Sequence, residues 1–333
     1  MSNQNNQSLR KRSVFKLNYS SLNWLMLLVL LVIQLAVFSS LTPYFLQLKN
    51  LLPVGREITT LGIVAIGQTL CILAGGFDLS VGGTAAISGV VAAYFCSPKM
   101  LGFPFGIGLT VALLTSLVVG MINGFLITKI KIHPFIATMA MNFILGGAAI
   151  LITKQPITVN TDSFRFLGAT TVGAIEFPLP IFLLVGLYLL FYFILRYTVF
   201  GRRLYCTGGN IEAARIAGIH VERTIFFTYT FSSLLAGFAG FVLASRLATA
   251  SPNIGAAFPL QSIAAAVLGG TALSGGEGNI WGTFLGVFVT GLLANGLIMI
   301  GASQAWRDIA TGLVLIAAIV LQLSSKRSRR FMS

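Results

Sequence analysis

Charge is scarce in this chain of 333 residues. Only 9% of the residues are charged and 56% are hydrophobic, whereas a typical soluble domain carries about 25% charged residues. This composition excludes an ordinary soluble protein. Apolar runs follow one another along the chain, and a run of roughly 20 residues crosses the ~30 Å hydrocarbon core of a bilayer as a helix. We therefore expect an all-α polytopic membrane protein.

Residues that carry most enzyme chemistry are also few. The chain has eight acidic residues, two histidines and three cysteines, and it lacks the HExxH, GxSxG and Walker A patterns. The three cysteines show no CxxC spacing and are interpreted as small packing residues. The sequence therefore predicts no catalytic residue, no metal site and no cofactor bound by this chain.

The apolar runs predict ten membrane spans with a cytoplasmic N-terminus and C-terminus. We interpret the first run as an uncleaved helix rather than a signal peptide, because it continues without a clear cleavage site. The predicted spans are residues 22–42, 57–75, 80–97, 104–128, 134–153, 178–195, 225–247, 260–275, 279–300 and 305–323. They form one transmembrane domain, 22–323, between tails 1–21 and 324–333.

The basic residues support this orientation. With the N-terminus inside, 15 of the 22 Lys and Arg residues fall in cytoplasmic segments and 7 on the other side, as the positive-inside rule requires. The net charge of +14 therefore indicates topology and contact with membrane lipid, not nucleic-acid binding. The longest cytoplasmic loop is then 196–224, and the longest external loop is 154–177.

Several segments of the chain resemble one another. LAGGFDLSVGG (73–83) is similar to VLGGTALSGG (267–276), and GMINGFLI (120–127) is similar to GLLANGLI (291–298). Many transporters are built from related halves, and paired glycine-interrupted helices often mark their substrate site. We predict an internal repeat, although chance similarity among small residues explains the same pattern.

Polar residues inside the apolar runs are candidates for a translocation path. Uncharged polar side chains in lipid are unfavourable, so they are expected to face other helices or a pore. Asp78 and Ser80 either cap the helix that starts near Val81 or line the path beside it. Aromatic rings either stack on a sugar or simply pack. The candidates are Gln68, Asp78, Ser80, Asn123, Phe135, Asn142, Phe143, Gln261 and Asn295.

Energy coupling to an ion gradient has little support in the sequence. Ion-driven carriers keep ionisable residues within their spans, and no predicted span here carries an acid at its centre. Asp78 is expected in a short turn between two apolar runs. A path with amides and hydroxyls but no fixed charge suits a neutral, hydroxyl-rich solute.

The stretch GRRLYCTGGNIEAARIAG, residues 201–218, concentrates charge in the predicted cytoplasmic loop. Glu212, Ala213 and Ala214, followed after three residues by Gly218, predict a short helix that ends in a glycine turn. This helix is either a docking element for a partner or a solvated segment that arginines hold at the lipid headgroups. The charge pattern alone does not decide between these two interpretations.

The EAA-x3-G spacing resembles the coupling-loop motif of ABC importer permeases, although the isoleucine-x-leucine-proline that follows in that motif is missing. Together with GGFDLSVGG (75–83), FIATMAMNFILGG (135–147), IAAAVLGGTALSGGEGNIWGTFLG (263–286) and NGLIMIG (295–301), it makes nearly the whole chain similar to the permeases of ribose-type monosaccharide ABC importers. Phe77, Gly83 and the pair Cys206-Thr207 depart from the family pattern, which leaves the substrate open.

The resemblance implies a permease subunit, not an enzyme, in a bacterial inner membrane. It implies a second permease chain, identical or related, two ATPase subunits that hold ATP and Mg, and an extracytoplasmic sugar-binding protein. The alternative substrates are autoinducer-2, a nucleoside or a branched-chain amino acid, and the alternative mechanism is a stand-alone secondary carrier. The residues implied in ATPase coupling are Gly201, Arg202, Gly208, Gly209, Asn210, Glu212, Ala213, Ala214, Arg215 and Gly218.

Overall fold

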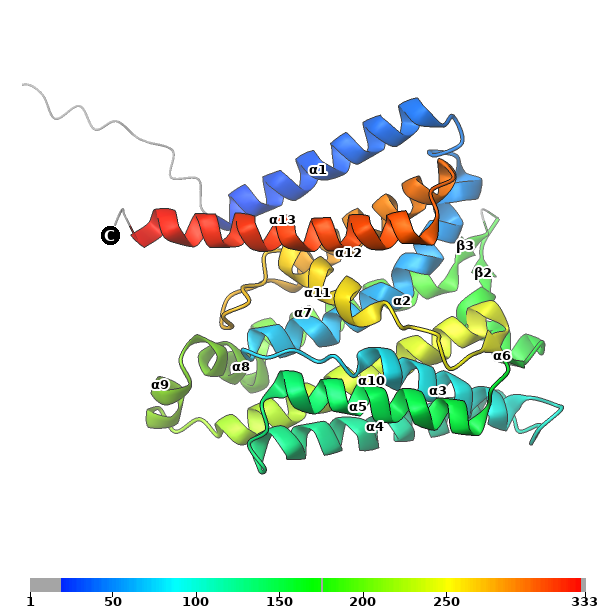
Figure 1. Ribbon diagram of the computed structural model, residues 1–333, viewed down its shortest axis with the longest axis horizontal. Helices are drawn as coiled ribbons and strands as arrows, with labels where there is room; N and C mark the ends of the chain where they lie inside the picture. Colours follow the sequence, from blue (N-terminus) through cyan, green and yellow to red (C-terminus); the bar gives the residue numbers. More distant parts are fainter. Residues whose placement is uncertain (1–18, 175, 331–333) are drawn as a thin grey trace, which may run out of the picture.

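The computed structural model describes residues 19–174 and 176–330, and these form a bundle of helices with four very short strands (Figure 1). The predicted tail 1–21 lies almost entirely outside the described residues. The helices are α1 (Tyr19–Leu41), α2 (Leu48–Leu73), α3 (Val81–Cys96), α4 (Phe105–Thr128), α5 (Pro134–Ile152), α6 (Asp162–Ala169), α7 (Leu179–Tyr197), α8 (Val199–Gly209), α9 (Ile211–Ile216), α10 (Val221–Leu247), α11 (Phe258–Leu268), α12 (Ile280–Met299) and α13 (Gln304–Arg330).

Every predicted span contains a helix. Within the described part of the chain, six helices are long and apolar enough to cross a membrane, namely α2, α4, α5, α7, α10 and α12. Three shorter helical segments are also apolar: Leu25–Leu41, which is part of α1, and the helices α3 and α11. The chain is therefore an all-α, multi-pass membrane protein.

Three helices begin or end at positions that differ from the predicted spans. Helix α2 begins at Leu48, before the predicted start at residue 57, because its charged first turns continue the helix beyond the apolar run. Helix α11 ends at Leu268, not at 275, because Gly270 has a positive φ of 88° that a helix cannot continue through. Helix α13 continues through most of the predicted tail, as far as Arg330.

The two ends of the bundle carry different loops (Figure 1). Helices α8 and α9 lie at the end where α1 begins and α13 ends, whereas α6, β2 and β3 lie at the opposite end. At that opposite end β1 (Ile157–Thr158) pairs antiparallel with β4 (Thr249–Ala250), and β2 (Thr171–Val172) pairs with β3 (Phe177–Pro178). Loops that were expected on one side of the membrane therefore lie at one end of the structure.

Helix α10 lies at the centre and packs against α2, α3 and α4. Small residues allow these close crossings: a Cβ on Gly67 would lie 2.8 Å from Cα of Ser232, and one on Gly120 would lie 2.7 Å from Cα of Thr230. Small residues let helix backbones approach in this way in membrane proteins. The interior of the bundle thus brings α2, α3, α4 and α10 into backbone contact.

The two similar glycine segments adopt the same local structure. After α2, the amides of Gly75 and Gly76 bond to the carbonyls of Ile72 and Cys71. After α11, the amides of Gly270 and Thr271 bond in the same way to Val267 and Ala266. Gly75 and Gly270 have φ of 86° and 88°, and this is the glycine C-cap of an α-helix.

Candidate translocation path and coupling surface

Asp78 lies in the segment between α2 and α3, and it is completely buried. Its Oδ1 accepts hydrogen bonds from the Ser80 amide at 2.9 Å and the Ser80 hydroxyl at 2.6 Å, and its Oδ2 accepts one from the Ser232 hydroxyl at 2.8 Å. No Lys or Arg in the described residues forms an ion pair with it. The turn that holds this acid is thus inside the bundle, where the sequence indicated only a short connection between spans.

Ser80 links this turn to α4 and does not cap α3. Its side chain makes no hydrogen bond to the start of α3; it donates to Asp78 and accepts from Nδ2 of Asn123 at 2.8 Å. The cap comes instead from α5, where Oδ1 of Asn142 accepts the Gly83 amide at 2.8 Å. The capping interpretation was therefore wrong for Ser80, because a side chain from another helix satisfies the free amide.

Two further side chains hold the backbone of the same turn. The Thr138 hydroxyl of α5 accepts the Leu79 amide at 3.0 Å, and the Tyr229 hydroxyl of α10 donates to the Phe77 carbonyl at 3.3 Å. Residues 77–83 are therefore fixed by α4, α5 and α10. We call Asp78, Ser80, Asn123, Asn142 and Ser232, together with Thr138 and Tyr229, the polar cluster.

Several buried polar atoms of α2, α3, α4 and α10 have no hydrogen-bond partner within the described residues. They are Nε2 and Oε1 of Gln68, Oδ1 of Asn123, and the hydroxyls of Ser88 and Ser233. Leaving a buried polar group unpaired costs about 1–3 kcal/mol. Unpaired groups in such numbers require an explanation beyond packing.

The remaining path candidates do not join the polar cluster. Phe135 and Phe143 lie on the exposed face of α5, with exposed fractions of 47% and 68%. Asn295 forms a reciprocal amide pair with Asn50 at 3.0 and 3.1 Å, and Gln261 lines a separate pocket of about 420 Å³ between α11 and α13. The structure thus brings together Asp78, Ser80, Asn123 and Asn142, buries Gln68 on α2, and separates the other four.

The glycine pair of α8, Gly208 and Gly209, contacts the end of α2 and the segment between α11 and α12. A Cβ on Gly208 would overlap the Leu73 carbonyl oxygen at the end of α2 and would lie 2.6 Å from the Gly276 amide. That amide donates to the same Leu73 carbonyl at 3.0 Å. A Cβ on Gly275 would lie 3.0 Å from Cα of Gly75. We call Gly75, Gly208, Gly209, Gly275 and Gly276 the glycine junction.

Helix α9 is built as the sequence predicted. Oδ1 of Asn210 accepts the Ala213 amide at 3.0 Å and caps the start of the helix, and Gly218, at φ 76°, follows its end. Ala214 is buried, whereas Ile216 is 89% exposed. The helix therefore turns one side to the bundle and presents a large apolar side chain outward.

Ion pairs fix α9 to its neighbours. Arg215 lies 3.0 Å from Glu212 and 3.3 Å from Glu222, and Glu222 lies 3.4 Å from Lys131 in the connection between α4 and α5. Exposed pairs contribute only about 0–1 kcal/mol each. Their consequence here is geometric, since Glu222 at the start of α10 pairs both with Arg215 of α9 and with Lys131, which is distant in sequence.

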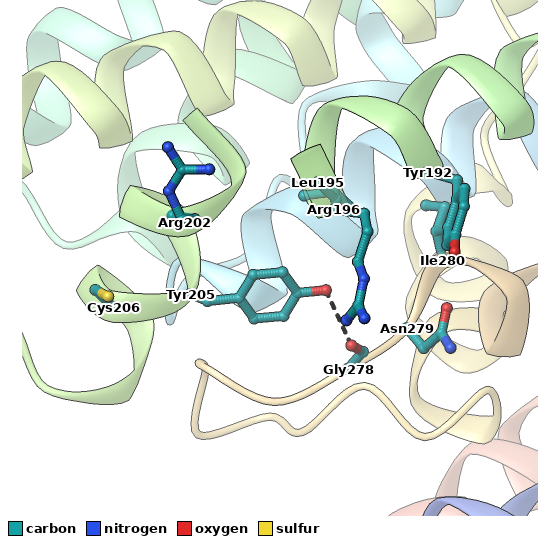
Figure 2. A pocket seen from close by; sticks show the side chains of 9 residues that line it. All are labelled: Tyr192, Leu195, Arg196, Arg202, Tyr205, Cys206, Gly278, Asn279 and Ile280. Atoms are coloured by element: carbon teal, nitrogen blue, oxygen red, sulfur yellow. Dashed lines mark hydrogen bonds between the residues drawn. The ribbon is translucent and has the colours of Figure 1, made fainter. Parts of the chain in front are cut away.

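A pocket of about 640 Å³ opens beside α8, between the end of α7 and the segment that precedes α12 (Figure 2). Arg196 extends from α7 toward Gly278, and the Tyr205 hydroxyl donates to the Gly278 carbonyl at 3.0 Å. Burial raises the pKa of Tyr205 although the charge of Arg196 acts in the opposite direction, so the hydroxyl stays protonated as a donor. Arg202 lines the same pocket, whereas Gly201 packs under the end of α7.

Comparison with known proteins identifies the class. Residues 50–319 match the family described as branched-chain amino acid transport system / permease component. The chain belongs to this permease family. The chain is 35% identical to the ribose import permease RbsC of Haemophilus influenzae, a match that covers 88% of this chain and 90% of the relative.

Other permeases in the family show the same degree of similarity. RbsC of Bacillus subtilis is 37% identical over 87% of this chain and 90% of its own length, and the fructose import permease FrcC of Rhizobium meliloti is 33% identical over 88% and 83%. No solved structure matches the chain significantly. The resemblance to ribose-type permeases is thereby confirmed.

Several residues that organise the permease were not identified from the sequence. Ser232, which binds Asp78, is one of many hydroxyl residues in α10, and Glu222 and Lys131 looked like ordinary loop charges. Asn50 lies in a segment predicted to be a loop. Each of these contacts joins residues far apart in the chain, so local sequence patterns carry little signal for them.

Proposed function

We propose that this permease is the membrane subunit of an ATP-driven ABC importer for a monosaccharide. The proposal includes ten spans with both termini in the cytoplasm of a bacterium, a membrane domain over residues 22–323, a coupling loop at 196–224 and an external loop at 154–177. Its relatives are named for the import of ribose, fructose and arabinose, which supports a neutral sugar. The family's description supports a branched-chain amino acid as the alternative.

The contact of α8 with the end of α2 and with the segment after α11 carries the proposal. Helix α9 presents Ile216 outward, and α8, one residue away, touches the end of α2 and the segment after α11 through the glycine junction. Movement of α9 by a partner would therefore reach the turn that holds Asp78 through backbone contacts. The ATPase is proposed to bind α9 and to supply this movement, with ATP and Mg on the ATPase.

The polar cluster is proposed as part of the sugar path in a closed state. Hydroxyl and amide groups recognise sugar hydroxyls, and unpaired polar atoms on Gln68, Ser88, Asn123 and Ser233 would gain partners once water or sugar enters. A broken helix inside a bundle is tolerated where it lines such a cavity. A sugar-binding protein outside the cell is proposed to deliver the substrate, and a second permease chain to complete the transporter.

Substitution on α9 tests the coupling assignment. Ile216→Ser is expected to reduce both co-purification of the ATPase and ATP-dependent uptake about tenfold or more, because loss of a central anchor of a protein interface costs about 2 kcal/mol or more and about 1.4 kcal/mol is tenfold. The matched control is Leu151→Ser, since Leu151 at the far end of α5 is also 89% exposed. Equal behaviour of the two variants would show that α9 is not the docking site.

The buried carboxylate of Asp78 favours one competing function, a stand-alone carrier driven by protons or sodium. Proteoliposomes that contain this chain alone distinguish the two. We expect no sugar accumulation under an imposed gradient, and accumulation without an ATPase would establish the carrier. The substrate is determined by isolating the associated binding protein and titrating it with a panel of sugars, a branched-chain amino acid and a nucleoside.

A further inference from the structure

The length of α7 and the aromatic residues near its end place the pocket in Figure 2 where lipid headgroups are expected. Helix α7 has 19 residues, which at 1.5 Å per residue span about the thickness of the hydrocarbon core, so Arg196 in its last turn reaches the boundary. Tyr192 lies one turn earlier, and its ring centroid is 5.9 Å from that of Trp281. Tyrosine and tryptophan concentrate at this boundary in membrane proteins.

The positive charge in this pocket is unpaired. Arg196 and Arg202 line it and are exposed, and neither forms an ion pair with a carboxylate of the described residues. Figure 2 shows Arg196 pointing toward Gly278, while the Arg202 guanidinium turns away and makes only a long contact of 3.5 Å with the Tyr197 carbonyl. Arg196 is therefore the guanidinium directed into the pocket, and Arg202 would join it only after a change of side-chain rotamer.

The walls of the pocket suit a phosphate group with an apolar chain attached. Its volume, about 640 Å³, lies within the range of ligand sites. Tyr192, Leu195 and Ile280 provide an apolar wall, and Asn279 stands at the start of α12, where the positive end of the helix dipole favours an anion. Guanidinium groups match the geometry of phosphate oxygens.

We propose that this pocket binds the headgroup of an anionic phospholipid from the cytoplasmic leaflet. Basic pockets between membrane helices on that side recognise such headgroups. A bound lipid would connect α7, α8 and the segment 276–280 at a place next to the glycine junction. The pocket lies on the proposed coupling loop 196–224, but it is separate from Ile216 of α9, the side chain proposed to anchor the ATPase.

Lipid binding to the purified full-length protein tests the proposal. The delipidated protein is titrated with phosphatidylglycerol or phosphatidylcholine, and native mass spectrometry counts bound lipid. Arg196→Gln is expected to weaken phosphatidylglycerol binding at least about tenfold, as expected for the loss of a charge-assisted hydrogen bond, and Arg202→Gln is expected to weaken it less. The matched control is Arg203→Gln, which removes the same charge from the neighbouring position of α8 outside the pocket, and it is expected to stay within about twofold.

Four results would overturn the proposal. Equal losses in Arg196→Gln and Arg203→Gln would mean a diffuse surface charge effect, and equal binding of phosphatidylcholine would remove the requirement for an anionic lipid. If inorganic phosphate alone raises the thermal unfolding midpoint, and Arg196→Gln abolishes this increase, the pocket binds a free anion. Unchanged lipid binding in Arg196→Gln, with loss of ATPase co-purification, would assign it to a partner protein.

Discussion

Gly208→Ala tests the contact between α8 and the end of α2. The new Cβ would overlap the Leu73 carbonyl oxygen and would lie 2.6 Å from the Gly276 amide. Non-bonded carbon atoms prefer separations of about 3.5–4.0 Å, so α8 has to move by more than about 1 Å. The neighbouring groups are backbone atoms at the ends of helices, and they cannot rotate out of the way as a side chain does.

The free-energy change follows from these contacts. Overpacking of a close contact costs about 1–3 kcal/mol, and separation of the Gly276 amide from the Leu73 carbonyl, now 3.0 Å apart, costs about another 1 kcal/mol. We expect a total of about 2–4 kcal/mol. A thermal unfolding midpoint in detergent that falls by about 3–6 °C is the expected result for a chain of 333 residues.

A control lies next to this residue. A Cβ on Gly209 meets no atom within 4 Å, and Gly209 does not have a positive φ, so Gly209→Ala is expected to unfold within about 1 °C of the wild type. ATP-dependent uptake in proteoliposomes with the partner subunits is expected to fall in Gly208→Ala and to persist in Gly209→Ala. If the two variants unfold and transport alike, the glycine junction does not hold α8 against α2.

Two further changes examine buried polar contacts. Ser232→Ala removes a donor from buried Asp78 and is expected to lower the free energy of unfolding by about 1–3 kcal/mol. Ser233→Ala removes a hydroxyl without a hydrogen-bond partner among the described residues and is expected to be neutral. Chemical denaturation of both proteins checks this, and a reversed order would contradict the assigned bond. Asn50→Ala leaves the Asn295 amide without its partner and is expected to cost about 1–3 kcal/mol, while the double change of both residues to Leu recovers most of it. A double variant no more stable than Asn50→Ala would show that the pair contributes little.

The helical membrane class and the helix positions could be predicted from the sequence because they depend on local composition. The exclusion of charge from the apolar runs is visible residue by residue, and every predicted span contains a helix. The short helix α9 was predicted for the same reason, since Asn210 and Gly218 mark its ends locally. Helix ends differ from the predicted span bounds where charged turns continue a helix, as at the start of α2.

The candidate site could be predicted only in part. Asp78, Ser80, Asn123 and Asn142 stood out because polar residues are unfavourable in apolar spans, and the structure places them in one cluster. Phe135 and Phe143 were chosen for a different reason, as rings that could stack on a sugar, and they lie on the outer face of α5. A residue type shows that a side chain is unusual in its helix, but not toward which neighbour it turns.

The sequence by itself determined that this chain is a helical membrane permease, because hydropathy, charge distribution and ordered motifs are properties of residues close together in the chain. Only the tertiary structure decided that the turn around Asp78 is held inside the bundle by three helices, and that Gly208 contacts the end of α2. These contacts join residues far apart in sequence, and they depend on how closely the helix backbones pack. Such packing follows from the shape of the whole bundle, which no single segment specifies.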